Sequence, residues 1–185
     1  MPTYQTPLRD MRFAYSELFN PADIQALPGF EEVNSELVET ILEEAGKFCE
    51  SVLQPLNRSG DEEGCHFENG TVTTPKGFKE AYKAYCENGW GALTTSTAYG
   101  GQGLPNIVGT MVEEIICASN MSFGMYPGLT HGAYNAIEHY GTDELKAIYL
   151  PNMVAGTWSG TMCLTEPHCG TDLGLLRTKA EPQAD

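Results

Sequence analysis

The residues with the clearest capacity for chemistry lie in one stretch, Met162–Asp172, which reads MCLTEPHCGTD. Pro167 fixes a backbone bend and lacks an N–H donor, while Gly170 permits a turn with positive φ or the close approach of a ligand. Free N–H groups in such a turn form a concavity suited to an anion or to the polar edge of a heterocycle. An ordinary turn between two strands explains the same residues, so composition alone leaves both interpretations open.

The same stretch contains side chains of types that bind transition metals, namely Cys163, His168 and Cys169. Their spacing matches no standard zinc pattern, and no fourth ligand lies nearby in the sequence. None of the six cysteines forms a CxxC pair. We therefore expect no metal site.

Charge and hydrophobicity exclude some classes of protein. The 185 residues include 10 basic and 25 acidic side chains, a formal charge of -15, which argues against binding to nucleic acid or to an anionic membrane surface. With 41% hydrophobic residues the chain can form a real core. No secretory signal and no apolar run of about 18 residues is present, so we expect no membrane span and a cytoplasmic protein.

The first 150 residues have the periodicity of helices, which would position the stretch that follows. The clearest amphipathic pattern runs from residue 35 to Pro55, with Leu37, Ile41 and Ala45 on one face. The polar segment 57–74 is predicted to be a loop with a short strand pair around Asn69-Gly70. Further helices are predicted at 9–19, 20–28, 75–89, from Pro105 through Ile116, at 122–139, and from a Thr142 cap towards Gly156.

After Gly156 the pattern changes. Residues 157–164 (TWSGTMCL) and 174–182 (GLLRTKAEP) are predicted to be strands. Two strands alone cannot bury a face. The fold class is therefore predicted to be mainly α, a helical domain followed by the first strands of a β domain whose remainder is missing.

One predicted helix has an unusual composition. Residues 123–133 are uncharged, and Gly124, Gly128 and Gly132 recur every four residues. This spacing leaves room either for a bound chain or for close packing of a neighbouring helix. His131 in the same segment is more typical of a hydrogen-bonded core histidine than of an acid or base.

Four motifs, which follow one another along the chain in the same order as in the family, resemble segments of the acyl-CoA dehydrogenases. The stretch MCLTEPHCGTD resembles the family's flavin-binding signature, YGTDELKAIYLPNMVAGTW resembles the helix and strand before it, AYGGQGL its Tyr-Gly-Gly-x-Gly loop, and LLRTKA the later Thr-x-Ala strand. The resemblance covers roughly residues 35–185. The opening TPLRDMRFAYSELF is similar to the N-terminal extension of a larger, mostly bacterial branch, which includes enzymes acting on 3-methylmercaptopropionyl-CoA.

The resemblance implies a domain order and a set of site residues. It implies an N-terminal extension (1–34), an N-terminal helical domain (35–156) and the start of a middle β domain (157–185). Glu166 and Asp172 would order the signature loop. The residues implied to bind the cofactor FAD are Met162, Leu164, Thr165, Gly170 and Thr171, and those implied to bind substrate are Thr171, Gly128 and His131.

The implied reaction is α,β-dehydrogenation of an acyl-CoA thioester to the trans-2-enoyl-CoA, with an electron-transfer flavoprotein or a similar acceptor as partner. The complete enzyme is expected to be a homo-oligomer. The family's catalytic base is a glutamate of the C-terminal domain, which no residue here matches, so the chain alone is expected to be inactive. Two alternatives stay open: an acyl-CoA oxidase-like flavoenzyme that passes electrons to oxygen, and a non-catalytic helical binding module.

Overall fold

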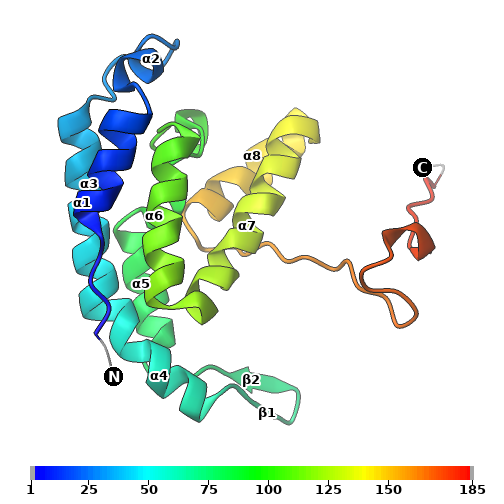
Figure 1. Cartoon of the computed structure of the whole chain (residues 1–185). Coiled ribbons are helices and arrows are strands. Elements are labelled where there is room, and N and C mark those ends of the chain that lie inside the picture. Colours follow the sequence, from blue (N-terminus) through cyan, green and yellow to red (C-terminus); the bar gives the residue numbers. More distant parts are fainter. Residues whose placement is uncertain (1–2, 184–185) are drawn as a thin grey trace.

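The computed structural model describes residues 3–183 and is mainly helical (Figure 1). None of its described helices is both long enough and apolar enough to cross a bilayer. The helices are α1 (Leu8–Phe13), α2 (Pro21–Gln25), α3 (Ser35–Phe48), α4 (Gln54–Glu63), α5 (Phe78–Glu87), α6 (Asn106–Ser119), α7 (Met121–Tyr140) and α8 (Asp143–Val154), and the strands are β1 (His66–Glu68) and β2 (Thr71–Thr73).

The core lies where the apolar faces of α3 and α6 meet, with α7 on the other side of α6 (Figure 1). The predicted amphipathic pattern of α3 is confirmed, since its buried residues recur at helical spacing. Each such side chain contributes up to about 1.5–3 kcal/mol through burial. The core side chains with 2% exposure or less on these two helices are Val38, Leu42, Ala45, Val108, Val112 and Ile115.

The helix ends follow local signals in the sequence. The side chains of Asn20 and Thr142 accept hydrogen bonds from the amides of Ala22 and Leu145, which confirms both predicted caps. Gly89 adopts a φ of 72° just after α5, as predicted for a residue that ends a helix. These signals therefore mark the start of α2, the start of α8 and the end of α5.

The prediction that Pro55 ends the helix is wrong. The chain passes through a π-helical turn (Cys49–Leu53) and continues as α4, so residues 57–63 are helical rather than loop. Pro55 lies in the first turn of α4, where a residue without an N–H donor is tolerated. The predicted strand pair is confirmed: β1 and β2 are antiparallel and joined by Asn69 and Gly70, whose φ angles of 50° and 79° suit a two-residue hairpin.

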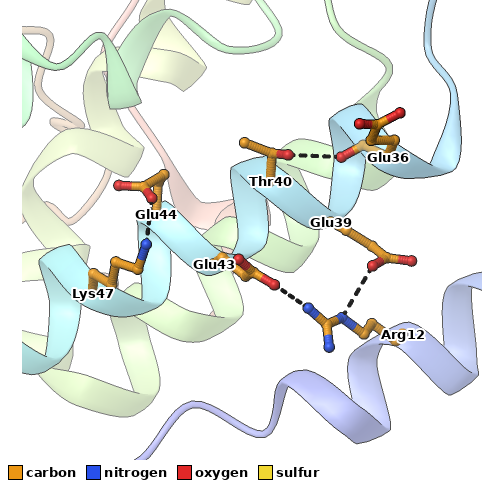
Figure 2. A network of polar contacts seen from close by, with 7 residues as sticks. All are labelled: Arg12, Glu36, Glu39, Thr40, Glu43, Glu44 and Lys47. Atoms are coloured by element: carbon orange, nitrogen blue, oxygen red, sulfur yellow. Dashed lines mark hydrogen bonds and ion pairs between the residues drawn. The ribbon is translucent and has the colours of Figure 1, made fainter.

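The N-terminal residues pack along α3. Met11 and Tyr15 are buried, and Arg12 on α1 forms ion pairs with Glu39, at 3.4 Å, and with Glu43 on α3 (Figure 2). The arginine and both carboxylates are about 40% exposed, so water and salt screen each pair and its contribution is small, about 0–1 kcal/mol. Burial of Met11 and Tyr15 therefore holds this segment more firmly than the ion pairs do.

The two strands predicted at 157–164 and 174–182 are not formed. Beyond α8 the chain leaves the helices as an extended segment (Figure 1). The described residues after Val154 contain one short bridge, Glu166 to Cys169, and one 3₁₀ turn, Leu173–Leu175. A strand needs a hydrogen-bonded neighbour, and no strand of residues 3–183 lies beside either segment.

Candidate functional site

A cavity with a volume of 310 Å³ lies between α5, α6, α7 and the end of α8. Its aromatic side is formed by Tyr82 and Tyr85 of α5 together with Trp90 from the turn that follows. It opens to the surface where Glu113 on α6 and Gly128 on α7 are exposed. The volume is at the lower end of the range for small-molecule sites, about 300–1,000 Å³.

Two glycines allow the walls of this cavity to come together. A Cβ atom on Gly124 of α7 would lie 2.8 Å from the Sγ atom of Cys117 on α6, and one on Gly109 would lie 2.5 Å from the Cγ2 atom of Thr94. Both distances are too short for a real Cβ atom. The small residues thus bring α6, α7 and the segment around Thr94 into close contact while leaving the space beside them open.

Gly128 and His131, two of the residues implied to bind substrate, both line the cavity from α7. Sequence reasoning missed the residues that face them, which are Glu113 and the three aromatic side chains. The only local signal for Glu113 was its place four residues after Gly109 on α6, which puts both on one face of that helix. Thr171, the third residue implied to bind substrate, lies on the extended segment and does not line the cavity.

The phenol groups around the cavity are hydrogen-bond donors rather than bases. Burial raises the pKa of Tyr82 and of Tyr134 to about 12, and it also raises the pKa of Tyr85. Tyr82 donates to the carbonyl oxygen of Gly156 at 3.1 Å, and Tyr134 donates to Oε1 of Glu138 at 2.8 Å. These contacts hold the cavity walls, so the arrangement suits binding better than proton abstraction.

The chain that follows α8 crosses α7 beside the cavity. The amide of Gly160 donates to Oγ1 of Thr130 at 3.1 Å, and the hydroxyls of Tyr126 and Ser159 hydrogen-bond to each other. A Cβ atom on Gly160 would lie 2.4 Å from the Cβ atom of Ala133, so only glycine allows this close crossing. The crossing directs the chain from α8 toward Met162.

The residues implied to bind FAD lie on the segment after α8, which leaves the helices (Figure 1), and none of them lines the cavity. They are Met162, Leu164, Thr165, Gly170 and Thr171, and all five are exposed. Within residues 3–183, no hydrogen bond to protein is made by the backbone N–H groups of Leu164, Thr165, Gly170 and Thr171. The Thr165 hydroxyl is likewise free of protein partners among the described residues. A set of free amides and a hydroxyl fits a ligand that offers acceptors, such as the edge of a flavin or a diphosphate.

The predicted loop-ordering role of Glu166 and Asp172 is confirmed. The carboxylate of Glu166 accepts hydrogen bonds from Oγ1 and N of Thr178 and from N of Arg177, and these bonds lower its pKa, with the Thr178 hydroxyl contributing most. The carboxylate of Asp172 accepts a hydrogen bond from the amide of Gly174 at 3.1 Å. Glu166 is therefore engaged within its own loop.

A second group of side chains in this loop consists of Glu166, His168 and Cys169, whose potential ligand atoms lie within 4.8 Å of one another. This group differs from the three side chains Cys163, His168 and Cys169 considered as metal ligands from the sequence, because it contains Glu166 in place of Cys163. The Glu166 oxygens already accept the three bonds above, and Nε2 of His168 lies 2.9 Å from the carbonyl oxygen of Leu175. The potential ligand atoms of Glu166 and His168 thus already take part in ordering the loop.

Comparison with protein families finds a match over residues 35–157 to the model described as acyl-CoA dehydrogenase, N-terminal domain. Among curated proteins, 3-methylmercaptopropionyl-CoA dehydrogenase of Ruegeria pomeroyi is 43% identical over 99% of this chain and 31% of its own length. A butyryl-CoA dehydrogenase of Syntrophomonas wolfei is 33% identical over 97% of this chain and 30% of its own length. The chain thus spans about a third of the length of these relatives.

Solved structures share the fold. Butyryl-CoA dehydrogenase from Megasphaera elsdenii aligns with a TM-score of 0.66 over 78% of this chain and 36% of that chain. A chain from work on the electron transferring flavoprotein of Acidaminococcus fermentans aligns with a TM-score of 0.67 over 82% of this chain and 37% of that chain. Both are 23% identical to this chain, so the likeness shows the fold alone.

Proposed function

The chain belongs to the acyl-CoA dehydrogenase family, and from this premise we propose that it is the N-terminal part of an FAD-dependent enzyme that converts an acyl-CoA thioester to the trans-2-enoyl-CoA. The observation that carries the proposal is the family match over 35–157, the segment whose helices enclose the cavity. The proposed division is an extension (1–34), a helical domain (35–156) and the start of a β domain (157–185).

We assign the acyl group of the substrate to the cavity, beside Gly128 and His131. The amide of Leu164 and the amide and hydroxyl of Thr165 would donate to the flavin edge, and Met162 would lie against its ring. Gly170 and Thr171 would approach the diphosphate and the CoA side of the substrate. FAD, when bound, supplies the acceptor for the β hydride.

The unpaired amide and hydroxyl donors of the signature loop would hold the edge of bound FAD and would stabilise negative charge on the reduced flavin with little reorganisation. We assign no catalytic base among residues 3–183. The carboxylate of Glu166 is unsuited to that role, because its loop hydrogen bonds lower its pKa and hold it in place.

For the substrate we propose a short acyl group, including one that carries a methylthio substituent. The relative that is 43% identical is named for 3-methylmercaptopropionyl-CoA, and a cavity of 310 Å³ suits a short chain. Tyr82, Tyr85 and Trp90 present aromatic surface, and a thioether sulfur makes favourable contacts with aromatic rings. We further propose a cytoplasmic homo-oligomer that passes electrons to an electron-transfer flavoprotein.

Turnover by the complete enzyme tests the proposal. A panel of acyl-CoA thioesters, including butyryl-, hexanoyl-, palmitoyl- and 3-methylmercaptopropionyl-CoA, would be assayed with a dye acceptor and, separately, for oxygen consumption. We expect dye reduction with the short thioesters, little oxygen uptake, and no turnover by the isolated 185-residue chain. Failure of the complete enzyme to reduce the dye with any thioester would overturn the proposal, and rapid oxygen uptake would favour an oxidase.

A further inference from the structure

Glu113 is the only carboxylate among the described residues that line the cavity, and no lysine or arginine lines it. Its Oε1 atom lies 3.8 Å from the point that a Cβ atom on Gly128 would occupy. Gly128 has no side chain to shield this oxygen. The carboxylate therefore lies directly against the part of α7 to which we assign the acyl group.

No basic side chain neutralises this carboxylate. The ion pairs formed within residues 3–183 do not include Glu113. The charge of Glu113 acts on a neighbouring group. The pKa of the Cys117 thiol is raised mainly by burial and, to a lesser extent, by the charge of Glu113. A second negative charge entering the cavity would meet the same repulsion, and no lysine or arginine among the described lining residues would pair with it.

We propose that Glu113 is a specificity-determining residue, which admits acyl groups with an uncharged tail and excludes acyl groups that end in a carboxylate. The inference rests on the function proposed above and names the substrate class of the same site. Specificity of this kind comes from an unfavourable interaction with the wrong substrate, so the residue need not contribute to binding of the right one. Uncharged tails would contact the aromatic side and stay clear of the charge.

Hexanoyl-CoA and adipoyl-CoA form a matched pair for the test, because both have six-carbon acyl groups and only the second ends in a carboxylate. In the complete enzyme, the ratio of kcat/KM for hexanoyl-CoA to kcat/KM for adipoyl-CoA should fall at least about tenfold in Glu113→Gln, equivalent to about 1.4 kcal/mol. Glu113→Lys should lower the ratio further. The control is Glu114→Gln, which removes the same charge from the adjacent residue, which is exposed and does not line the cavity.

A binding measurement separates failure of this inference from failure of the proposed function. Trp90 lines the cavity and Trp158 does not, so in a Trp158→Phe background the tryptophan fluorescence of the 185-residue chain reports occupancy without flavin or turnover. Hexanoyl- and adipoyl-pantetheine would be titrated against this chain with and without Glu113→Gln. Preference for the hexanoyl compound that Glu113→Gln abolishes supports the inference even if the complete enzyme turns over no thioester. An unchanged ratio in Glu113→Gln, in either assay, overturns it.

Discussion

Asn120 joins two parts of the structure that are far apart in the sequence, and its replacement tests how the cavity helix is held. The side chain is fully buried. Its Oδ1 atom accepts a hydrogen bond from the amide of Phe123 at 3.1 Å, which caps α7. Its Nδ2 atom donates to the carbonyl oxygen of Leu53 at 3.0 Å, at the end of the π-helical turn.

Asn120→Ala removes both bonds. Loss of an N-cap costs about 1 kcal/mol, and loss of a buried hydrogen bond costs a further 0.5–1.5 kcal/mol or so. We therefore expect the free energy of unfolding to fall by about 1.5–2.5 kcal/mol. For a chain of this length each kcal/mol lowers Tm by about 2–4 °C.

Urea unfolding followed by far-UV circular dichroism measures this change as a shift of the midpoint at constant m. The matched control is Asn34→Ala: Asn34 is exposed and caps α3 through the amide of Leu37 at 2.9 Å, but bonds nothing else. It should cost about 1 kcal/mol. If the two variants lose the same stability within error, the bond from Asn120 to Leu53 contributes nothing and the reasoning is wrong.

Three further predictions concern local features. Gly156 has a φ of 70°, and a Cβ atom there would lie 2.3 Å from Sγ of Cys86, so Gly156→Ala should lower the free energy of unfolding by about 1–3 kcal/mol in the same urea assay, whereas an unchanged midpoint would contradict the packing. Gly132→Ala on α7, where a Cβ atom would meet nothing within 4 Å, should instead raise it by about 0.5–1 kcal/mol, and a loss of stability would count against an open helix face. Because the pKa of Glu166 is below its ordinary value of 4.5, its carboxylate stabilises the loop above that pH, and this stabilisation is lost as the pH falls through the lowered pKa. The amide resonance of Thr178, which donates to this carboxylate, should therefore shift over that pH range in NMR spectra. A resonance that is unchanged by acid, or that shifts equally in Glu166→Gln, would refute this.

Local sequence signals predicted much of the fold, because each acts through its own neighbours. The caps at Asn20 and Thr142 and the hairpin at Asn69-Gly70 depend on residues within a few positions. Pro55 misled the same reasoning. A proline normally ends a helix, but here the π-helical turn before it changes the hydrogen-bonding register and places it in the first turn of α4.

Non-local features could not be predicted in this way. A strand is defined by its partner, so the extended pattern of residues 157–164 did not suffice to predict pairing. The cavity likewise combines residues from four helices. The resemblance to the acyl-CoA dehydrogenase family implied a role for Gly128 and His131, which lie on one helix, whereas Glu113 and Trp90 become part of the site only when α5, α6 and α7 pack together.

The most direct test of the central claim is the absorption spectrum of the complete enzyme, purified under native conditions and titrated anaerobically with a short acyl-CoA such as butyryl-CoA. We expect a yellow protein with bound FAD whose flavin absorbance is bleached by the thioester. We further expect that Thr165→Val, which removes the free hydroxyl of the signature loop, lowers the reduction potential of the bound flavin. A colourless protein that does not take up added FAD, or bound flavin that no acyl-CoA reduces, would contradict the account.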